Sequence, residues 1–448
     1  MTRKTLIRNA RIINEGRQFS GSLLIEGDRI MEIYDREPIP DPVDAEVIDA
    51  AGQWLLPGVI DDQVHFREPG LTHKGDIQSE SASGIAGGVT SFMEMPNTLP
   101  PTITLELLKE KQERAAMTSL ANYSFYIGAT NDNLKVLQEA DPETVCGIKV
   151  FMGSSTGNML VDHPEALRGI FEQKKFLVAV HCEDETTIRK NLEIYRNKYQ
   201  DRIPVRCHPE IRSEEACFLS SSRAVDLATR CGTRLHLLHL STAKELSLLS
   251  NKRPLREKKI TGEVCVHHLW FDDNDYARLG NKIKWNPAIK TAKDREALLA
   301  AVNDQTLDIV ATDHAPHTTE EKQREYLKAP SGGPLLQHSL VMMLELHRMG
   351  KISIEQVVKV MCHQPAELFN IRQRGFIRKG YYADLVLADP EISWIVQPEN
   401  ILAKCGWSPL EGTQFHTSVT HTWVNGNLVY KNGKFVNSSR GQLIRFDR

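Results

Sequence analysis

The 448-residue sequence predicts an α/β protein built around a (β/α)8 TIM barrel. The first observation is alternation: eight short apolar runs, typical of buried strands, are separated for the most part by polar stretches with helical periodicity. The second is that β-type segments lie at both ends of the chain. Alternating strands and helices indicate a parallel sheet, and eight strands favour a closed barrel. An open doubly wound sheet is the alternative.

The barrel is expected to span residues 57–370. Its strands are predicted at 59–66, 89–95, 123–128, 147–152, 176–181, 234–240, 261–267 and 307–312. The helix-periodic stretches are 104–117, 164–173, 213–230, 242–249, 337–348 and 354–369.

The sequence pattern at both ends of the chain predicts short strands. Residues 1–56 contain strands at 5–7, 10–13, 22–26 and 29–34, and residues 371–448 contain strands at 380–389 and 420–430. Asn-Gly pairs at 425–426 and 432–433 are typical of hairpin turns. We expect the two end segments to pair into one small β-sandwich beside the barrel.

Composition excludes several classes of function. The 55 Lys and Arg residues nearly balance the 58 Asp and Glu residues, so there is no electrostatic case for nucleic acid or an anionic membrane. No apolar run is long enough to cross a bilayer, and the first residues lack a signal-peptide core. The eight cysteines have no C-x-x-C spacing, which indicates reduced thiols and a cytoplasmic protein.

Polar residues gather where the predicted strands end. Catalytic groups of such barrels lie at the carboxyl ends of the strands, so these side chains are expected to share one site. His236 is expected to be structural, and His267 and His268 to serve in packing around the site. The strand-end residues selected for the site are His65, Arg67, Asn97, Lys149, His181, His239, Asp313 and His317.

The first strand carries Asp61, Gln63 and His65 on one face, with Asp62 on the other. A D-x-H-x-H row here would be a strong metal signature. Because an amide oxygen is a weak ligand compared with imidazole, Gln63 is a doubtful metal ligand. Three alternatives remain open: one weakened metal position, a site rebuilt around Asp61, or a single-metal site.

Lys149 lies within a strand-like run, where an unpaired ammonium would be heavily penalised. It is either paired with a carboxylate or carboxylated by CO2 into an anion that bridges two metal ions. The second reading predicts a metal site whose ligands suit zinc, with Asp313 as the base. The predicted ligands are His65, Lys149, His181, His239 and Asp313.

Several segments together resemble the dihydroorotase family of the amidohydrolase superfamily. They are His-Phe-Arg-Glu-Pro-Gly at 65–70, Met-Pro-Asn-Thr at 95–98, Lys149, Val-His at 180–181, His-Leu-Ser-Thr at 239–242, Asn-Pro at 286–287 and Thr-Asp-His-Ala-Pro-His at 312–317. The match spans most of the chain. It implies zinc-dependent, reversible hydrolysis of dihydroorotate to N-carbamoyl-L-aspartate in pyrimidine synthesis.

The resemblance also implies residue roles. Arg67, Asn97 and His317 would hold the substrate carboxylate, Asn286 would contact the ring, and backbone at Gly332 would close over it. A metal-activated water would attack the ring amide, and Asp313 would take its proton. A homodimer, and association with a transcarbamoylase, are further implications.

Two other functions remain. One is a hydantoinase-like or allantoinase-like cyclic amide hydrolase, against which Arg67 with Asn97 argues, because those substrates need no carboxylate fork. The other is a catalytically silent dihydroorotase-like subunit, which Gln63 favours. The retained Lys149, His181 and His239 argue for an active enzyme.

Overall fold

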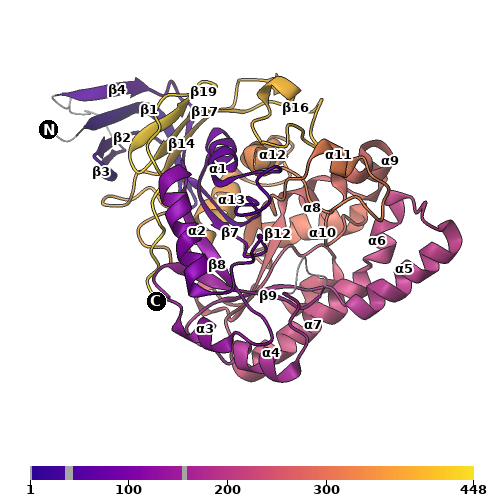
Figure 1. Cartoon of the computed structure of the whole chain (residues 1–448). Helices are drawn as coiled ribbons and strands as arrows, with labels where there is room; N and C mark the ends of the chain where they lie inside the picture. The colour runs from indigo at the N-terminus through magenta and orange to yellow at the C-terminus, as the bar shows by residue number, and fades with distance from the viewer. Residues whose placement is uncertain (1–2, 36–43, 154–158) are drawn as a thin grey trace.

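The computed structural model describes residues 3–35, 44–153 and 159–448. Its centre is an eight-stranded sheet in which neighbouring strands follow chain order and run parallel (Figure 1). The strands are β6 (Val59–Val64), β7 (Val89–Glu94), β8 (Asn122–Gly128), β9 (Val145–Phe151), β10 (Val178–His181), β11 (Leu235–Leu237), β12 (Ile260–Cys265) and β13 (Ile309–Ala311).

The sheet closes into a barrel between its first and last strands. Val64, the final residue of β6, forms a parallel bridge with His314, just beyond β13. The next amide, His65 N, donates to His314 O at 2.7 Å. This closure confirms the barrel and excludes the open sheet.

Helices surround the barrel, and capping side chains fix where several of them begin. Thr104 accepts a hydrogen bond from Leu107 N at the start of α2, and Ser213 does the same for Ala216 N at the start of α7. The helices are α1 (Ile77–Ala86), α2 (Leu105–Thr118), α3 (Leu134–Glu139), α4 (Pro164–Phe171), α5 (Glu185–Tyr199), α6 (His208–Ile211), α7 (Glu214–Cys231), α8 (Val266–Trp270), α9 (Tyr276–Leu279), α10 (Ala292–Asn303), α11 (Thr319–Lys322), α12 (Ser339–Arg348), α13 (Ile354–Val358) and α14 (Gln364–Phe369).

Two predicted helices differ in detail. Residues 242–249 form only a short 3-10 helix, Lys244–Leu248, because the side chain of Glu245 folds back onto Ser241 N and the Thr242 hydroxyl. The stretch 354–369 is helical throughout, but a π-helical turn at Lys359–His363 separates α13 from α14.

The end segments pair into one mixed sheet beside the barrel, at the upper left of Figure 1. β5 joins the two halves, because it runs parallel to β1 and antiparallel to β14. A separate pair is β15 (Trp394–Ile395) with β16 (Gln414–Phe415). The mixed sheet contains β1 (Lys4–Asn14), β2 (Arg17–Glu26), β3 (Arg29–Tyr34), β4 (Ala45–Asp49), β5 (Trp54–Pro57), β14 (Leu385–Asp389), β17 (Ser418–Val424), β18 (Asn427–Lys431) and β19 (Lys434–Phe435).

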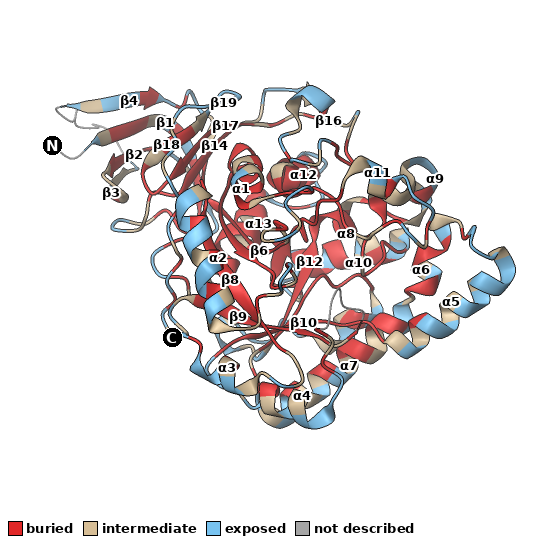
Figure 2. Ribbon diagram, viewed as in Figure 1, coloured by how far each residue is buried: buried red, intermediate tan, exposed pale blue. Residues whose placement is uncertain are grey.

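Burial follows this architecture (Figure 2): the barrel strands are buried, and the outer faces of helices such as α2 and α5 are exposed. Burying each large apolar side chain contributes about 1.5–3 kcal/mol. Among the described residues no helix has the length and apolarity needed to cross a membrane. The barrel brings the carboxyl ends of its strands together at one edge, where a site can form.

Candidate active site

A cavity of about 140 Å³, the strand-end pocket, opens at the carboxyl ends of the barrel strands. Every residue that the sequence selected for the site lines it except His317, whose ring lies against Arg67. The lining residues are Gln63, His65, Arg67, Asn97, Lys149, Phe151, His181, His239, Asn286, Asp313, Ala315, Ser331 and Gly332.

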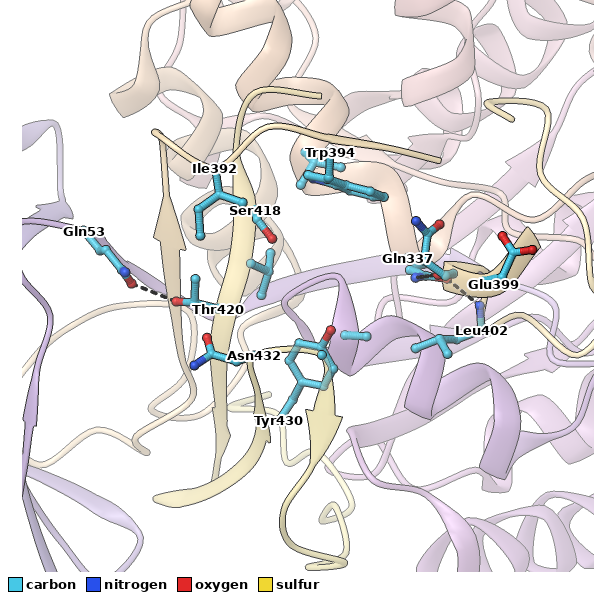
Figure 3. Close-up of a pocket in the computed structure, with 15 residues that line it drawn as sticks. Gln53, Gln337, Ile392, Trp394, Glu399, Leu402, Ser418, Thr420, Tyr430 and Asn432 are labelled. Carbon is cyan, nitrogen blue, oxygen red and sulfur yellow. Dashed lines mark hydrogen bonds between the residues drawn. The ribbon is translucent and has the colours of Figure 1, made fainter. Parts of the chain in front are cut away.

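A larger cavity, of about 700 Å³, lies between the mixed sheet and the start of α12 (Figure 3). Figure 3 shows Gln53 bonded to Thr420 on one side and Gln337 bonded to Leu402 on the other. Among the described residues that line it, Glu399 carries the only carboxylate, and there is no histidine or lysine. Of these two cavities, the strand-end pocket is therefore the one whose side chains suit acid–base or metal chemistry.

His65 and Asp313 form one side of the strand-end pocket. His65 Nε2 lies 3.0 Å from Asp313 Oδ1, and His65 Nδ1 lies 2.8 Å from Asn97 Oδ1. Both partner oxygens accept, so the single proton of a neutral ring bonds either to Asn97 from Nδ1 or to Asp313 from Nε2. Burial lowers the pKa of His65, and Asp313 partly opposes that shift.

Gln63 also contacts Asp313, but through its amide nitrogen. Gln63 Nε2 donates to Asp313 Oδ1 at 3.2 Å, while Oε1 faces the sulfur of Cys265 at 3.9 Å. The amide group nearest the carboxylate is thus a hydrogen-bond donor, which cannot bind a cation.

Asp61 does not reach the strand-end pocket, and the expectation that it shares a face with Gln63 and His65 is wrong. The pairing of β6 with β7 shifts register between Asp61 and Val64, which breaks strict alternation. Asp61 Oδ1 instead accepts from the backbone amides of Gln63 and Thr312, at 3.1 and 3.4 Å. A metal site rebuilt around Asp61 is therefore not formed.

Lys149 enters the pocket from β9 with a side chain that is almost completely buried. Its ammonium lies 4.9 Å from the ring centre of Phe151 and has no hydrogen-bond partner among the described residues. Burial lowers its pKa to about 8, against an opposing effect of Asp313. Burial lowers the pKa of His65 and of His239, and the charge of Lys149 lowers both pKa values further. The Lys149 ammonium therefore lies close to both sides of the pocket.

His181 and His239 form the other side. His181 Nδ1 lies 3.0 Å from His239 Nε2, and the rings meet edge to face. On its far edge His181 Nε2 lies 3.1 Å from Glu183 Oε2, which also pairs with Arg212. Burial alone would raise the pKa of Glu183, but Arg212 and His181 hold it at about 2. Glu183 thus lies at the outer edge of the His181 ring, and the Nδ1 edge faces His239.

Arg67 supplies the positive charge of the pocket. Its Nε donates to Pro316 O at 3.0 Å, and its Nη2 lies 3.0 Å from His317 Nε2. Burial lowers its pKa to about 10, so it stays charged at neutral pH. No carboxylate of the described residues lies within ion-pair distance of this guanidinium, although its side chain is buried.

Backbone at Ser331 and Gly332 closes one wall of the pocket. Gly332 N donates to Lys284 O at 2.8 Å, and Lys322 Nζ binds Pro330 O and Gly332 O. Gly332 has φ of 122°, and a Cβ there would lie 2.6 Å from Ala315 O. Only glycine fits this approach without displacing the wall.

Three pocket residues other than glycine have left-handed backbone: Arg67 (φ 70°), His239 (φ 41°) and Asp313 (φ 47°). Such residues are uncommon, and they cluster where a fold constrains functional side chains. All three lie two or three residues beyond the end of a barrel strand, so the barrel fixes the positions at which this strain is held.

Sequence reasoning missed the groups that support the pocket. Glu183 with Arg212 orients His181, and Lys284 and Lys322 hold the closing backbone. Glu183 stood two residues after His181 and could have been considered. The lysines gave no signal, because their partners are backbone carbonyls from other segments.

The donor set fits a divalent metal of the zinc class. His65, His181, His239 and Asp313 line the pocket, and nitrogen and carboxylate oxygen are common zinc ligands. Lys149 lies between the two sides. Gln63 does not fit, since its donor group faces Asp313.

Known proteins match this chain over most of its length. A model of the amidohydrolase family matches residues 54–429. A dihydroorotase of Halobacterium salinarum is 32% identical over 98% of this chain and 99% of its own length, and one of Staphylococcus epidermidis is 31% identical over 96% and 100%. The structure of L-hydantoinase (dihydropyrimidinase) from Arthrobacter aurescens is similar with a TM-score of 0.93 at 25% identity, covering 99% of this chain and 100% of that one. The structure of dihydropyrimidinase from Brevibacillus agri is similar with a TM-score of 0.88 at 26% identity, over 99% and 100%.

Proposed function

This chain belongs to the amidohydrolase family as a cyclic amide hydrolase, and we propose that its reaction is that of a dihydroorotase. The reaction is the reversible hydrolysis of (S)-dihydroorotate to N-carbamoyl-L-aspartate, a step of pyrimidine (UMP) synthesis.

The observation that carries this proposal is Arg67. A buried guanidinium without a carboxylate partner is costly unless a bound anion pairs with it. Dihydroorotate carries a carboxylate next to the ring, whereas hydantoins and dihydropyrimidines have none at that place. The charge of the pocket therefore favours dihydroorotate over the substrates named for the similar solved structures.

Arg67, Asn97 and His317 form the proposed carboxylate clamp. The guanidinium fork can donate two parallel hydrogen bonds to a carboxylate, and the Asn97 amide adds a further donor. The His317 ring would hold the guanidinium in place through its contact with Nη2. Asn286 Oδ1 is buried and has no partner among the described residues, so it suits a ring N–H. The backbone of Gly332 would cover the ring.

One or two zinc ions are the proposed cofactor, held by His65, His181, His239, Asp313 and a modified Lys149. Such a metal lowers the pKa of water and polarises a carbonyl, which is the chemistry that amide hydrolysis needs. Gln63 is left out of this ligand set, because its amide nitrogen faces Asp313.

Carboxylation of Lys149 is part of the proposal. A pKa of about 8 leaves a substantial fraction of neutral amine near neutral pH, and the neutral amine is the form that attacks CO2. The product carbamate would remove an unpaired buried ammonium and supply two oxygens between the two sides of the pocket.

Asp313 is the proposed general base and acid. Its Oδ1 lies within hydrogen-bond distance of Gln63 Nε2 and His65 Nε2, which fix the carboxylate at the end of β13. Oδ1 or Oδ2 would take the proton of the attacking water and return it to the ring nitrogen as the C–N bond breaks.

Metal analysis combined with a turnover assay tests the proposal. Zinc-replete protein is expected to convert dihydroorotate to carbamoyl aspartate and to leave carboxylate-free hydantoins largely unreacted. A preference for hydantoins would favour the alternative hydrolase. Absence of turnover in metal-replete, folded protein would instead favour a catalytically silent subunit, the reading that Gln63 supports.

The proposal also covers the cell compartment of the protein and its assembly with other subunits. All eight cysteines are free thiols, which supports a cytoplasmic protein. A homodimer, and association with a transcarbamoylase, are proposed from the family resemblance alone, and sedimentation with and without the partner enzyme tests both.

A further inference from the structure

A second group of ionisable side chains lies inside the barrel, apart from the strand-end pocket. Asp62 of β6, His236 of β11 and Glu263 of β12 are all fully buried, and none of them lines the pocket. Strands β13 and β12 stand between β6 and β11 in the sheet, so Asp62 reaches His236 across the barrel interior. One ligand atom from each residue lies within 4.8 Å of the others.

The atoms that converge in this core cluster have unmet bonding capacity. Asp62 Oδ1, Asp62 Oδ2, Glu263 Oε2 and His236 Nε2 are buried and have no hydrogen-bond partner among the described residues. Buried polar atoms are almost always bonded, and four orphans at one point indicate a missing partner. Three of the four are carboxylate oxygens, so that partner must be a cation or a donor.

The position of the proton on the His236 ring indicates which kind of partner is missing. Thr261 Oγ1 donates to Leu235 O at 3.1 Å, so it must accept from His236 Nδ1, which lies 2.9 Å away. Nδ1 therefore carries the proton, and the Nε2 of a neutral ring presents a lone pair to two carboxylates. Lone pairs facing one another are repulsive unless a positive centre lies between them.

The distances suit a metal ion as that centre. His236 Nε2 lies 3.3 Å from Asp62 Oδ2 and 3.6 Å from Glu263 Oε2. Ligands placed about 2.0–2.2 Å from a tetrahedral zinc ion lie about 3.3–3.6 Å from one another. The three residues offer one ligand atom each, which leaves the fourth position of a tetrahedral ion to a water molecule. Two carboxylates and a neutral imidazole carry a charge of −2, which a divalent ion cancels.

We propose that Asp62, His236 and Glu263 bind a divalent metal of the zinc class within the barrel, as a structural site separate from the strand-end pocket. One hydrogen bond connects the core cluster to the strand-end pocket. Glu263 Oε1 accepts from His239 N at 3.0 Å, so a metal on Oε2 fixes the backbone of a pocket histidine that has left-handed φ. Binding in the core thus holds His239 in place.

The competing occupant is a proton on His236 Nε2. Burial lowers the pKa of His236, but Asp62 and Glu263 together raise it to about 9, so a proton could also satisfy the cluster. The test must therefore distinguish a metal from a proton.

Anomalous diffraction from zinc-replete crystals of the unmodified protein is the direct measurement. The expected result is a peak, measured above and below the zinc edge, between Asp62 Oδ2 and His236 Nε2 and distinct from any peak in the strand-end pocket. Absence of a peak at the core cluster overturns the proposal and assigns the position to a proton.

Metal counting gives an independent test. In the variant that combines His181→Ala with Asp313→Asn, the strand-end pocket is disabled, and about one zinc per subunit is expected to survive dialysis. Adding Asp62→Asn should remove it. The matched control adds Asp308→Asn instead, which changes another buried barrel carboxylate, paired with Lys258 at 2.6 Å, and should leave the zinc in place. Zinc-free protein before Asp62 is changed overturns the proposal.

Discussion

The side-chain amide of Gln63 donates a hydrogen bond to Oδ1 of Asp313, with 3.2 Å between the two heavy atoms. The same oxygen faces His65 Nε2 at 3.0 Å. One carboxylate oxygen at the end of the last barrel strand is thus shared by two residues of the first strand. The residue at position 63 therefore determines which group faces the Asp313 carboxylate.

Gln63→His is expected to increase metal retention. An imidazole at this position would present a nitrogen lone pair to the region now occupied by an amide N–H, and imidazole is the stronger ligand. Zinc affinity should rise by about tenfold or more, the scale on which metal-site neighbours act. Competition with a chromogenic chelator measures it, with Gln53→His, in the distant cavity, as the control. Unchanged affinity would show that position 63 does not face the metal.

Asp313→Asn is expected to lower kcat by about 10²–10⁴-fold, the usual contribution of a general acid–base group. Dihydroorotate should still bind, because the carboxylate clamp is intact, and binding can be followed by calorimetry. Glu320→Gln, an exposed acid seven residues along the chain, should leave kcat unchanged. Retained turnover in Asp313→Asn would remove this residue as the base.

Arg67→Ala is expected to raise the KM for dihydroorotate about 10–100-fold, because a hydrogen bond to a charged group contributes about 1.5–3 kcal/mol. Arg67→Lys should recover only part of this, since an ammonium cannot form the two-point fork. Zinc content should be normal in both variants, which separates substrate binding from metal binding. Arg114→Ala, at a half-exposed arginine, is the control. An unchanged KM would refute the clamp.

Gly332→Ala is expected to impair turnover through geometry alone. The new Cβ would lie 2.6 Å from Ala315 O, at a φ of 122° that side chains rarely adopt. Gly350→Ala is the matched control, because Gly350 also has positive φ but no atom within 4 Å of its Cβ position. A loss of kcat/KM confined to Gly332→Ala identifies the closing wall. Equal behaviour of the two variants would mean that backbone strain alone is responsible.

The barrel and most of its pocket could be predicted because strand ends are a strong signal. Parallel strands bring their carboxyl ends to one edge, so residues as distant in sequence as His65, Lys149 and Asp313 had to meet there. The same logic predicted that Lys149 would be buried.

The remaining features depend on contacts that sequence periodicity does not encode. A register shift in β6 accompanies the contact of Asp61 with the backbone of Thr312 and the approach of Asp62 to His236 across the barrel. The left-handed backbone of His239 is set by the fold around it, and the local sequence pattern does not indicate it.

The closure between β6 and β13 also sets the order of events during synthesis. His65 and Asp313 lie 248 residues apart, so a ribosome completes most of the barrel before the base can meet its first partner. Joining contacts so distant in sequence is a slow step of folding. The proposed site is therefore incomplete until the last barrel strand has emerged, and the onset of the proposed activity would mark the moment at which the barrel closes.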